Sequence, residues 1–161
     1  MKKVIAFMLF ILSAFAFVGC NNSSKDSKTE VYTFSGENEY FYVSGGVAVL
    51  DGEEEVFSGG ELKLLKEEAF SDVYCFSTSF YIVDGAEKRY VLMNVVEDIP
   101  GGASVSLSGD LGKISGGNVI SEYKSTDMEA FINNLYFELA VTDSQGIEST
   151  YELKLNVEKI Y

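Results

Sequence analysis

The chain has 161 residues, with 25 acidic and 12 basic side chains, no histidine and a formal net charge of −13. Nucleic-acid binding depends on clustered Lys and Arg, so this excess of carboxylates argues against a nucleic-acid partner. Without histidine, the chain lacks the base of a Ser-His-Asp or Cys-His system and the ligand usual in catalytic zinc sites.

Residues 1–19 have the layout of a secretory signal peptide. Lys2 and Lys3 precede an apolar run from Val4 to Val18. A transmembrane helix needs about 20 apolar residues to cross the hydrocarbon core, and this run is shorter. We therefore expect a cleaved signal, and a retained anchor is the less favoured alternative.

The end of this segment resembles a bacterial lipobox, in which a small residue precedes an invariant cysteine. Gly19 and Cys20 lie where the apolar run meets a polar tract, and Phe17 stands where leucine is usual. The resemblance implies cleavage between Gly19 and Cys20, a diacylglycerol on the Cys20 sulfur and lasting attachment to the outer face of the cell membrane. Ordinary secretion is the alternative, because Ala14-Phe15-Ala16 fits a small-x-small cleavage pattern.

Residues 20–29 are predicted to be the lipidated cysteine and a flexible polar tether. Asn21 to Thr29 contains no apolar residue, a composition typical of disorder. A flexible segment of this length spans roughly 15–18 Å on average. The folded domain should therefore stay close to the membrane.

Residues 30–161 read as a single domain of ordinary size. One proline, 15 glycines, ten tyrosines and 12 phenylalanines in the chain favour strands over helices. Short strand-like segments between glycine-containing turns are typical of an all-β, antiparallel β-sandwich. We expect an immunoglobulin-like arrangement of about seven to nine strands, with a small closed β-barrel as the alternative.

An aromatic cluster, Tyr40-Phe41-Tyr42, falls in the first part of this domain. Neighbouring residues of a strand point to opposite faces, so either Phe41 or the two tyrosines point outward. Core and sheet packing is the favoured interpretation of these three residues, and a contact surface for protein or carbohydrate is the candidate function that exposed tyrosines would offer. The acidic run Asp51–Glu55 is expected to be a solvated turn, because it lacks the alternating ligands of a calcium loop.

The middle of the domain contains one helix candidate and two strand candidates. Glu61–Phe70 is the best helical segment, although its first residues also alternate. Tyr74–Ile82 alternates with a period of two, which predicts a strand. The denser apolar run Val91–Val96 indicates a central strand covered on both faces. Cys75 is expected to be a small buried residue; a bridge to Cys20 would require signal cleavage upstream of Cys20.

The C-terminal residues predict a β-hairpin. Leu139 should lie opposite Tyr151 so that core side chains face one another, which leaves Ser144-Gln145-Gly146 as a three-residue loop. Such loops favour a glycine in the left-handed conformation at the third position. This register places Glu138 opposite Glu152, an unfavourable pair. A slip of two residues would instead pair Glu138 with Lys154.

The segment Phe34-Ser35-Gly36-Glu37-Asn38-Glu39-Tyr40-Phe41 resembles the opening of small, uncharacterised Gram-positive (Firmicutes-type) lipoproteins. Their mature domains begin with aromatic-x-Gly-Glu-Ser-x-x-Trp and end in an amphipathic hairpin. In this chain Asn38 replaces the serine and Phe41 the tryptophan, and Gly101-Gly102 and the final hairpin are also similar. The resemblance spans most of the mature chain and implies an extracytoplasmic lipoprotein with a sandwich domain. It implies no catalytic residue.

Together these features predict a membrane-anchored extracytoplasmic lipoprotein that acts as a non-catalytic binding or structural module at the cell envelope. We expect it to bind the lipid bilayer through acylated Cys20 and an envelope protein through its domain, with no cofactor, metal or catalytic residue. The alternative is a carbohydrate-binding accessory or an enzyme acting on cell-wall polymers. A binding module predicts an exposed apolar patch, whereas an enzyme predicts a pocket with converging carboxylates of perturbed pKa.

Overall fold

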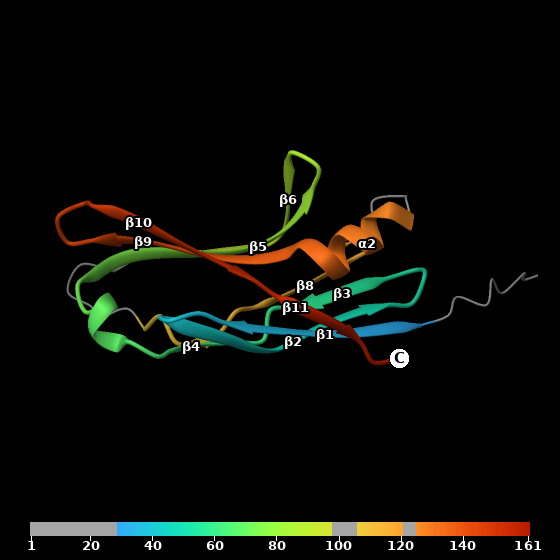
Figure 1. Cartoon of the computed structure of the whole chain (residues 1–161), viewed down its shortest axis with the longest axis horizontal. Helices are drawn as coiled ribbons and strands as arrows, with labels where there is room; N and C mark the ends of the chain where they lie inside the picture. The colour runs from blue at the N-terminus through green and yellow to red at the C-terminus, as the bar shows by residue number, and fades with distance from the viewer. Residues whose placement is uncertain (1–28, 98–105, 121–124) are drawn as a thin grey trace, which may run out of the picture.

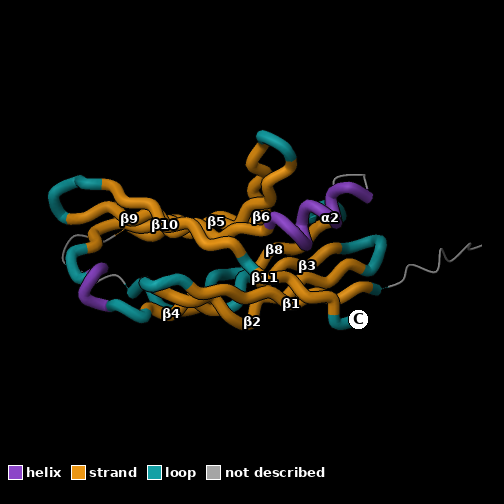
Figure 2. Tube along the Cα trace, in the orientation of Figure 1, coloured by secondary structure: helices purple, strands orange, loops and turns teal. Residues whose placement is uncertain are grey.

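The computed structural model describes residues 29–97, 106–120 and 125–161, which form two antiparallel sheets in two layers (Figures 1 and 2). Gly19, Cys20 and nearly all of the predicted tether lie outside the described residues, as does Gly101-Gly102. The prediction of an antiparallel β-sandwich is confirmed. The alternative of a closed barrel is wrong, because each sheet ends in separate edge strands.

Sheet A contains seven strands and sheet B contains four. In sheet A the order is β11 (Asn156–Lys159), β1 (Glu30–Glu37), β2 (Phe41–Leu50), β3 (Glu55–Ser58) and β8 (Lys113–Gly116), while β4 (Glu61–Leu64) pairs with β2 and with β7 (Gly109–Asp110). In sheet B the order is β10 (Glu148–Lys154), β9 (Leu135–Asp143), β5 (Val73–Asp84) and β6 (Glu87–Glu97). The described residues thus form eleven strands rather than seven to nine, because several pairings in sheet A involve only two to four residues.

Aromatic rings from both sheets fill the space between the layers. Phe34 and Phe57 of sheet A stack with their ring centroids 4.9 Å apart, and Phe57 meets Phe80 of sheet B at 5.2 Å. Phe80 also lies 5.1 Å from Phe137 on the neighbouring strand β9. All four side chains are at most 2% exposed. Such pairs contribute beyond the area they bury, so this cluster is the centre of the core.

The predicted helix over Glu61–Phe70 is wrong. Its first residues form the short strand β4, and its end forms a single 3-10 turn, η2 (Glu67–Phe70). The one α-helix in the described chain is α2 (Ser125–Asn134), which the sequence analysis does not predict. Phe131 of α2 is fully buried and packs edge-to-face on Tyr32 at 5.6 Å, so the helix covers one end of the core.

The expected central strand over Val91–Val96 is also corrected. β6 is an edge strand of sheet B, whereas β5 lies between β9 and β6 and has five consecutive buried residues, Thr78–Ile82. A bulge between Phe80 and Tyr81 interrupts the β5–β6 pairing. Beyond this bulge the tip of the β5–β6 hairpin rises away from sheet B (Figure 1).

The chain passes from sheet B to sheet A between β10 and β11. Only Leu155 separates the two strands, and its amide donates to the Leu135 carbonyl of β9 at 2.9 Å. β11 then pairs with the outer edge of β1, so the C-terminal strand lies beside the first strand of the domain. Both ends of the described domain therefore lie at the same end of the molecule (Figure 1).

Candidate functional site

The β9–β10 hairpin adopts the predicted register. Tyr151 pairs with Leu139, and the Asp143 amide donates to the Ile147 carbonyl at 3.1 Å across the three-residue loop. Gly146 has a φ of 82°, the left-handed conformation expected at the third loop position. The prediction is confirmed, and the alternative with Glu138 opposite Lys154 is wrong.

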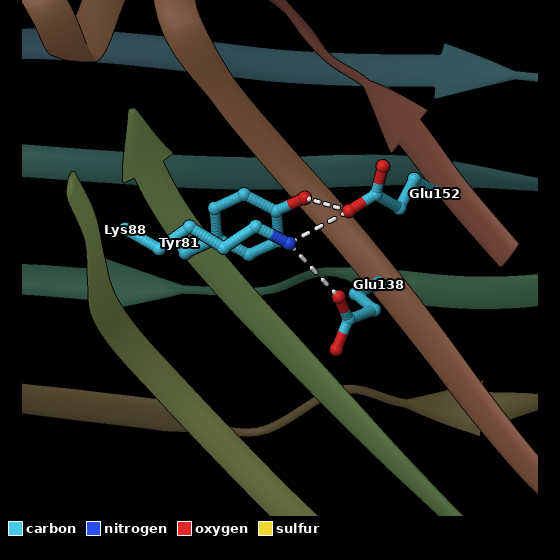
Figure 3. A network of polar contacts seen from close by, with 4 residues as sticks. All are labelled: Tyr81, Lys88, Glu138 and Glu152. Atoms are coloured by element: carbon cyan, nitrogen blue, oxygen red, sulfur yellow. Dashed lines mark hydrogen bonds and ion pairs between the residues drawn. The ribbon is translucent and has the colours of Figure 1, made fainter. Parts of the chain in front are cut away.

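The unfavourable pair is also present, and a distant lysine compensates for it. Glu152 lies opposite Glu138 on the outer face of sheet B. Lys88, on the rising part of β6, places its Nζ 2.7 Å from a Glu152 oxygen and 3.3 Å from a Glu138 oxygen (Figure 3). One ammonium group thus offsets the repulsion between two carboxylates.

Tyr81 completes this network. Its hydroxyl donates to the same Glu152 oxygen at 2.7 Å, and the Lys88 Nζ lies 4.2 Å from its ring centroid (Figure 3). Its ring stacks on Tyr136, with centroids 5.6 Å apart and planes at 6°, and contacts Tyr90 at 5.7 Å. Although it points to the outer face of sheet B, Tyr81 is 1% exposed because these neighbours cover it.

The network shifts the proton affinity of three groups. Burial, followed by the hydrogen bond to Glu152, raises the pKa of Tyr81 to about 12. The hydrogen bond to Lys88, followed by that from Tyr81, lowers the pKa of Glu152. The hydrogen bond to Glu152 raises the pKa of Lys88. At neutral pH the network therefore holds a charged lysine, a charged glutamate and a neutral tyrosine, which suits fixing the hairpin better than transferring protons.

Next to the network, β6 presents apolar side chains to solvent. Tyr90, Met93 and Val95 are 49%, 54% and 60% exposed, respectively. Met93 pairs with Ser79, and Val95 pairs with Ser77. Because paired residues share a face and the serines are short, the three side chains form an apolar strip along the outer margin of sheet B. We call Tyr90, Met93 and Val95 the β6 strip.

The candidate contact surface over Tyr40, Phe41 and Tyr42 does not include Phe41, which is fully buried as the favoured interpretation of core packing expects. Phe41 points into the core because its inward neighbours on β2 are Val43 and, beyond a bulge, Ala48. Tyr40 is half-buried and its ring lies 4.9 Å from that of Tyr151. Only Tyr42 points outward from sheet A, where it is half-buried beneath Lys63. The three residues do not form one surface.

The other candidate groups are also placed. Asp51 accepts hydrogen bonds from the Glu53 and Glu54 amides at 3.0 and 2.7 Å, which lowers its pKa and makes the acidic run a tight turn. Among the described residues, no group of three or more Cys, Asp and Glu could hold a metal ion.

Cys75 is a free, half-buried thiol on the outer face of sheet B rather than a fully buried residue.

A pocket opens between β6 and residues 106–112, lined by Phe76, Thr78 and Asn94 among others. Its one described carboxylate, Asp110, accepts a hydrogen bond from the Gly112 amide at 2.6 Å. Glu138 and Glu152, by contrast, lie on the outer face of sheet B. The paired carboxylates Glu138 and Glu152 therefore do not line this pocket, whereas the enzyme alternative predicts carboxylates that do.

No helix in the described part of the chain is long and apolar enough to cross a membrane. Comparison with protein-family models, with curated proteins and with solved structures found no match.

The residues of the polar network lie far apart in the sequence. Lys88 is 50 and 64 residues from its two carboxylate partners, and Tyr81 is 71 residues from Glu152, so no local pattern connects them. The one available signal was the predicted juxtaposition of Glu138 and Glu152, which requires a nearby cation.

Proposed function

We propose that this protein is a membrane-anchored extracytoplasmic lipoprotein whose sandwich domain is a non-catalytic module that binds another protein at the cell envelope. The observation that carries the binding part is the exposed β6 strip. Apolar side chains gathered on one sheet face beside polar neighbours are typical of protein contact sites. Methionine and tyrosine are suited to such surfaces, since one adapts its shape and the other offers a large rigid area.

The anchoring part of the proposal is supported by the first 29 residues. Lys2 and Lys3, the apolar run and Gly19-Cys20 have the order of a lipoprotein signal. The polar tether that follows holds the domain within about 30 Å of the bilayer. A partner embedded in, or lying on, the same membrane is therefore within reach of the β6 strip.

The test is photo-crosslinking in cells with the full chain. A photoreactive amino acid at Met93 should capture one reproducible envelope protein, identified by mass spectrometry. The matched control places the same group at Thr150, an exposed residue of the opposite edge strand β10. Capture of the same protein from both positions, or of none from Met93 while the chain remains in the membrane fraction, contradicts the proposal.

A further inference from the structure

The pocket between β6 and residues 106–112 has a polar pair on its inner side. Thr78 of β5 pairs with Asn94 of β6, and Thr78 lies between Phe76 and Phe80, which point into the core. Because paired residues share a face and side chains alternate along a strand, both polar side chains point toward the space between the sheets. They line the pocket, whose volume is about 350 Å³. This size lies near the lower end of the range of roughly 300–1,000 Å³ found for small-molecule sites.

The hydroxyl of Thr78 is available to a molecule in this pocket. Thr78 is 3% exposed, and its hydroxyl forms no hydrogen bond to any described residue. Among the described residues that are not exposed, every fully enclosed side-chain oxygen or nitrogen has a hydrogen-bond partner. The Thr78 hydroxyl is therefore not fully enclosed, and the pocket is the space that it reaches. Because burying a hydroxyl without a partner is unfavourable, we expect it to bond a polar atom of the molecule that occupies the pocket.

Asn94 is held so that one of its polar atoms remains free. Its Nδ2 donates to the Leu111 carbonyl at 2.7 Å, which orients the amide and leaves Oδ1 as an acceptor on the residue paired with Thr78. Gly112 has a φ of 87°, and a Cβ at this position would lie 3.1 Å from Nδ2, so the backbone approaches the amide closely. The Gly112 amide donates to one oxygen of Asp110, an exposed residue at the mouth of the pocket.

The remaining surface of the pocket is apolar and carries no positive charge. Phe76, Leu107 and Leu111 are at most 7% exposed and form the inner walls. Among the described residues that line it, none is a lysine or arginine, and Asp110 is the one carboxylate. An anion would therefore meet no cation, and a buried ammonium group would lack the paired carboxylates that offset its desolvation. Charge thus favours an uncharged ligand.

We propose that this pocket binds one uncharged sugar residue, either free or at the end of a glycan chain. A pyranose ring combines hydroxyls at its rim, which both donate and accept hydrogen bonds, with C–H groups on its two faces. The hydroxyls match Thr78 and Asn94 on the inner side and Asp110 at the mouth, while the C–H groups pack on the apolar walls. This inference adds a ligand to the domain and does not rest on the proposed protein contact of the β6 strip.

The test is saturation-transfer NMR on the full-length protein in lipid nanodiscs, with glucose, galactose, mannose and N-acetylglucosamine as separate probes. At least one of these sugars should bind, whereas glucuronic acid, which carries a carboxylate, should bind more weakly. Thr78→Val keeps the shape of the side chain and removes the hydroxyl, so it should weaken binding of the preferred sugar about tenfold. Because that hydroxyl has no partner among the described residues, the unfolding midpoint should not fall.

The matched control is Thr142→Val, which makes the same change on the outer face of β9, opposite Cys75, and should leave sugar binding unaltered. A second variant is Asp110→Asn, which should also weaken binding; its amide oxygen can still accept from Gly112, so the loop is kept. Binding of none of the four sugars, or equal affinities of Thr78→Val and the unmodified chain, overturns the proposal. A trisaccharide of the preferred sugar distinguishes the two sources, because tighter binding identifies a glycan end and equal binding a free sugar.

Discussion

Lys88 offsets a charge repulsion on the outer face of sheet B. Among the described residues, it is the one cation that forms ion pairs with Glu138 and Glu152, which lie opposite one another on adjacent strands. The ion pairs are partly exposed, with side-chain exposures of 42% for Lys88 and 21% for Glu138, so water and salt weaken them. Their main effect is to cancel a repulsion that the hairpin register imposes.

We expect Lys88→Met to lower the free energy of unfolding by about 1 kcal/mol, because it leaves two carboxylates opposed without a cation. Adding Glu138→Gln should restore part of this loss by removing one of the charges. Urea unfolding of the single and double variants measures both effects. Lys154→Met serves as the control, because it removes an exposed lysine from the same sheet. Equal losses from the two lysine variants contradict the assigned role.

Tyr81 predicts a stability effect that depends on pH. Its pKa is raised from 10.0 to about 12 in the folded chain, so the unfolded chain loses this proton first as pH rises. The associated stability is fully present below about pH 10, and it is lost as pH rises through the folded pKa of about 12. Tyr81→Phe should therefore cost about 1 kcal/mol at neutral pH through the lost hydrogen bond, and less above about pH 10. Urea unfolding of Tyr81→Phe and the unmodified chain, at neutral pH and above about pH 10, measures the cost at each pH. Tyr161→Phe is the exposed control. A constant difference would refute the assignment.

At the scale of elements, the sequence is most informative where one face must be buried. The β9–β10 hairpin is predictable to the residue, because Leu139 and Tyr151 must both face the core and Gly146 suits the turn. The position of β6 is not predictable in this way. An apolar run such as Val91–Val96 has the same sequence pattern in a central strand covered on both faces and in an edge strand with one exposed face. The tertiary arrangement decides between these outcomes.

The helix α2 carried a signal that the strand-rich background obscured. Met128, Phe131 and Ile132 of α2, with Leu135 at the start of β9, follow the i, i+3, i+4, i+7 spacing of an amphipathic helix. Phe131 and Leu135 are fully buried, while Ile132 is 37% exposed. A comparison of the helical period of 3.6 with the strand period of 2 over residues 128–135 favours the helix. The opposite error at Glu61–Phe70 arises because its first four residues, Glu61–Leu64, alternate with a period of two and form a strand.

Glycine substitutions test the turns of these elements. Gly146 and Gly85 both have positive φ and open space around the added Cβ, so alanine at either should cost about 1 kcal/mol through backbone strain alone. At Gly60, which also has positive φ, the Cβ would lie 2.2 Å from the Ser44 carbonyl oxygen. Gly60→Ala should therefore destabilise the domain clearly more than the other two in thermal or urea unfolding. Similar losses at all three positions would contradict the close approach of β2 to this turn.

At the scale of the whole molecule, composition predicted the class of fold and left the place of contact open. Carboxylates lie in turns such as residues 51–54 and also within strands, as at Glu138 and Glu152, while the β6 strip is uncharged. The binding surface that we propose rests on this strip rather than on the net charge of −13. Attachment to the membrane stays a prediction from the first 20 residues.

We expect Cys20→Ser to release the full-length protein from the membrane fraction and to abolish the mass of the attached lipid at its N-terminus. Without the thiol there is no site for the diacylglycerol, and the short polar tether binds lipid poorly. Fractionation and mass spectrometry of the N-terminal peptide measure both results. Cys75→Ser is the matched control and should leave both unchanged. An unaltered mass and membrane content in Cys20→Ser would refute lipidation.

The position of β1 has a mechanical consequence. In the lipoprotein that we propose, a pull on the anchor would enter the domain through β1, which lies between β2 and β11. Both neighbours run antiparallel to it, with β2 paired over the length of the strand and β11 paired from Tyr32 to Ser35. A force along β1 therefore loads two ladders in shear, so that many hydrogen bonds must break together. A pull along β1 should therefore require a higher unfolding force than a pull that separates one edge strand from its sheet, one hydrogen bond at a time.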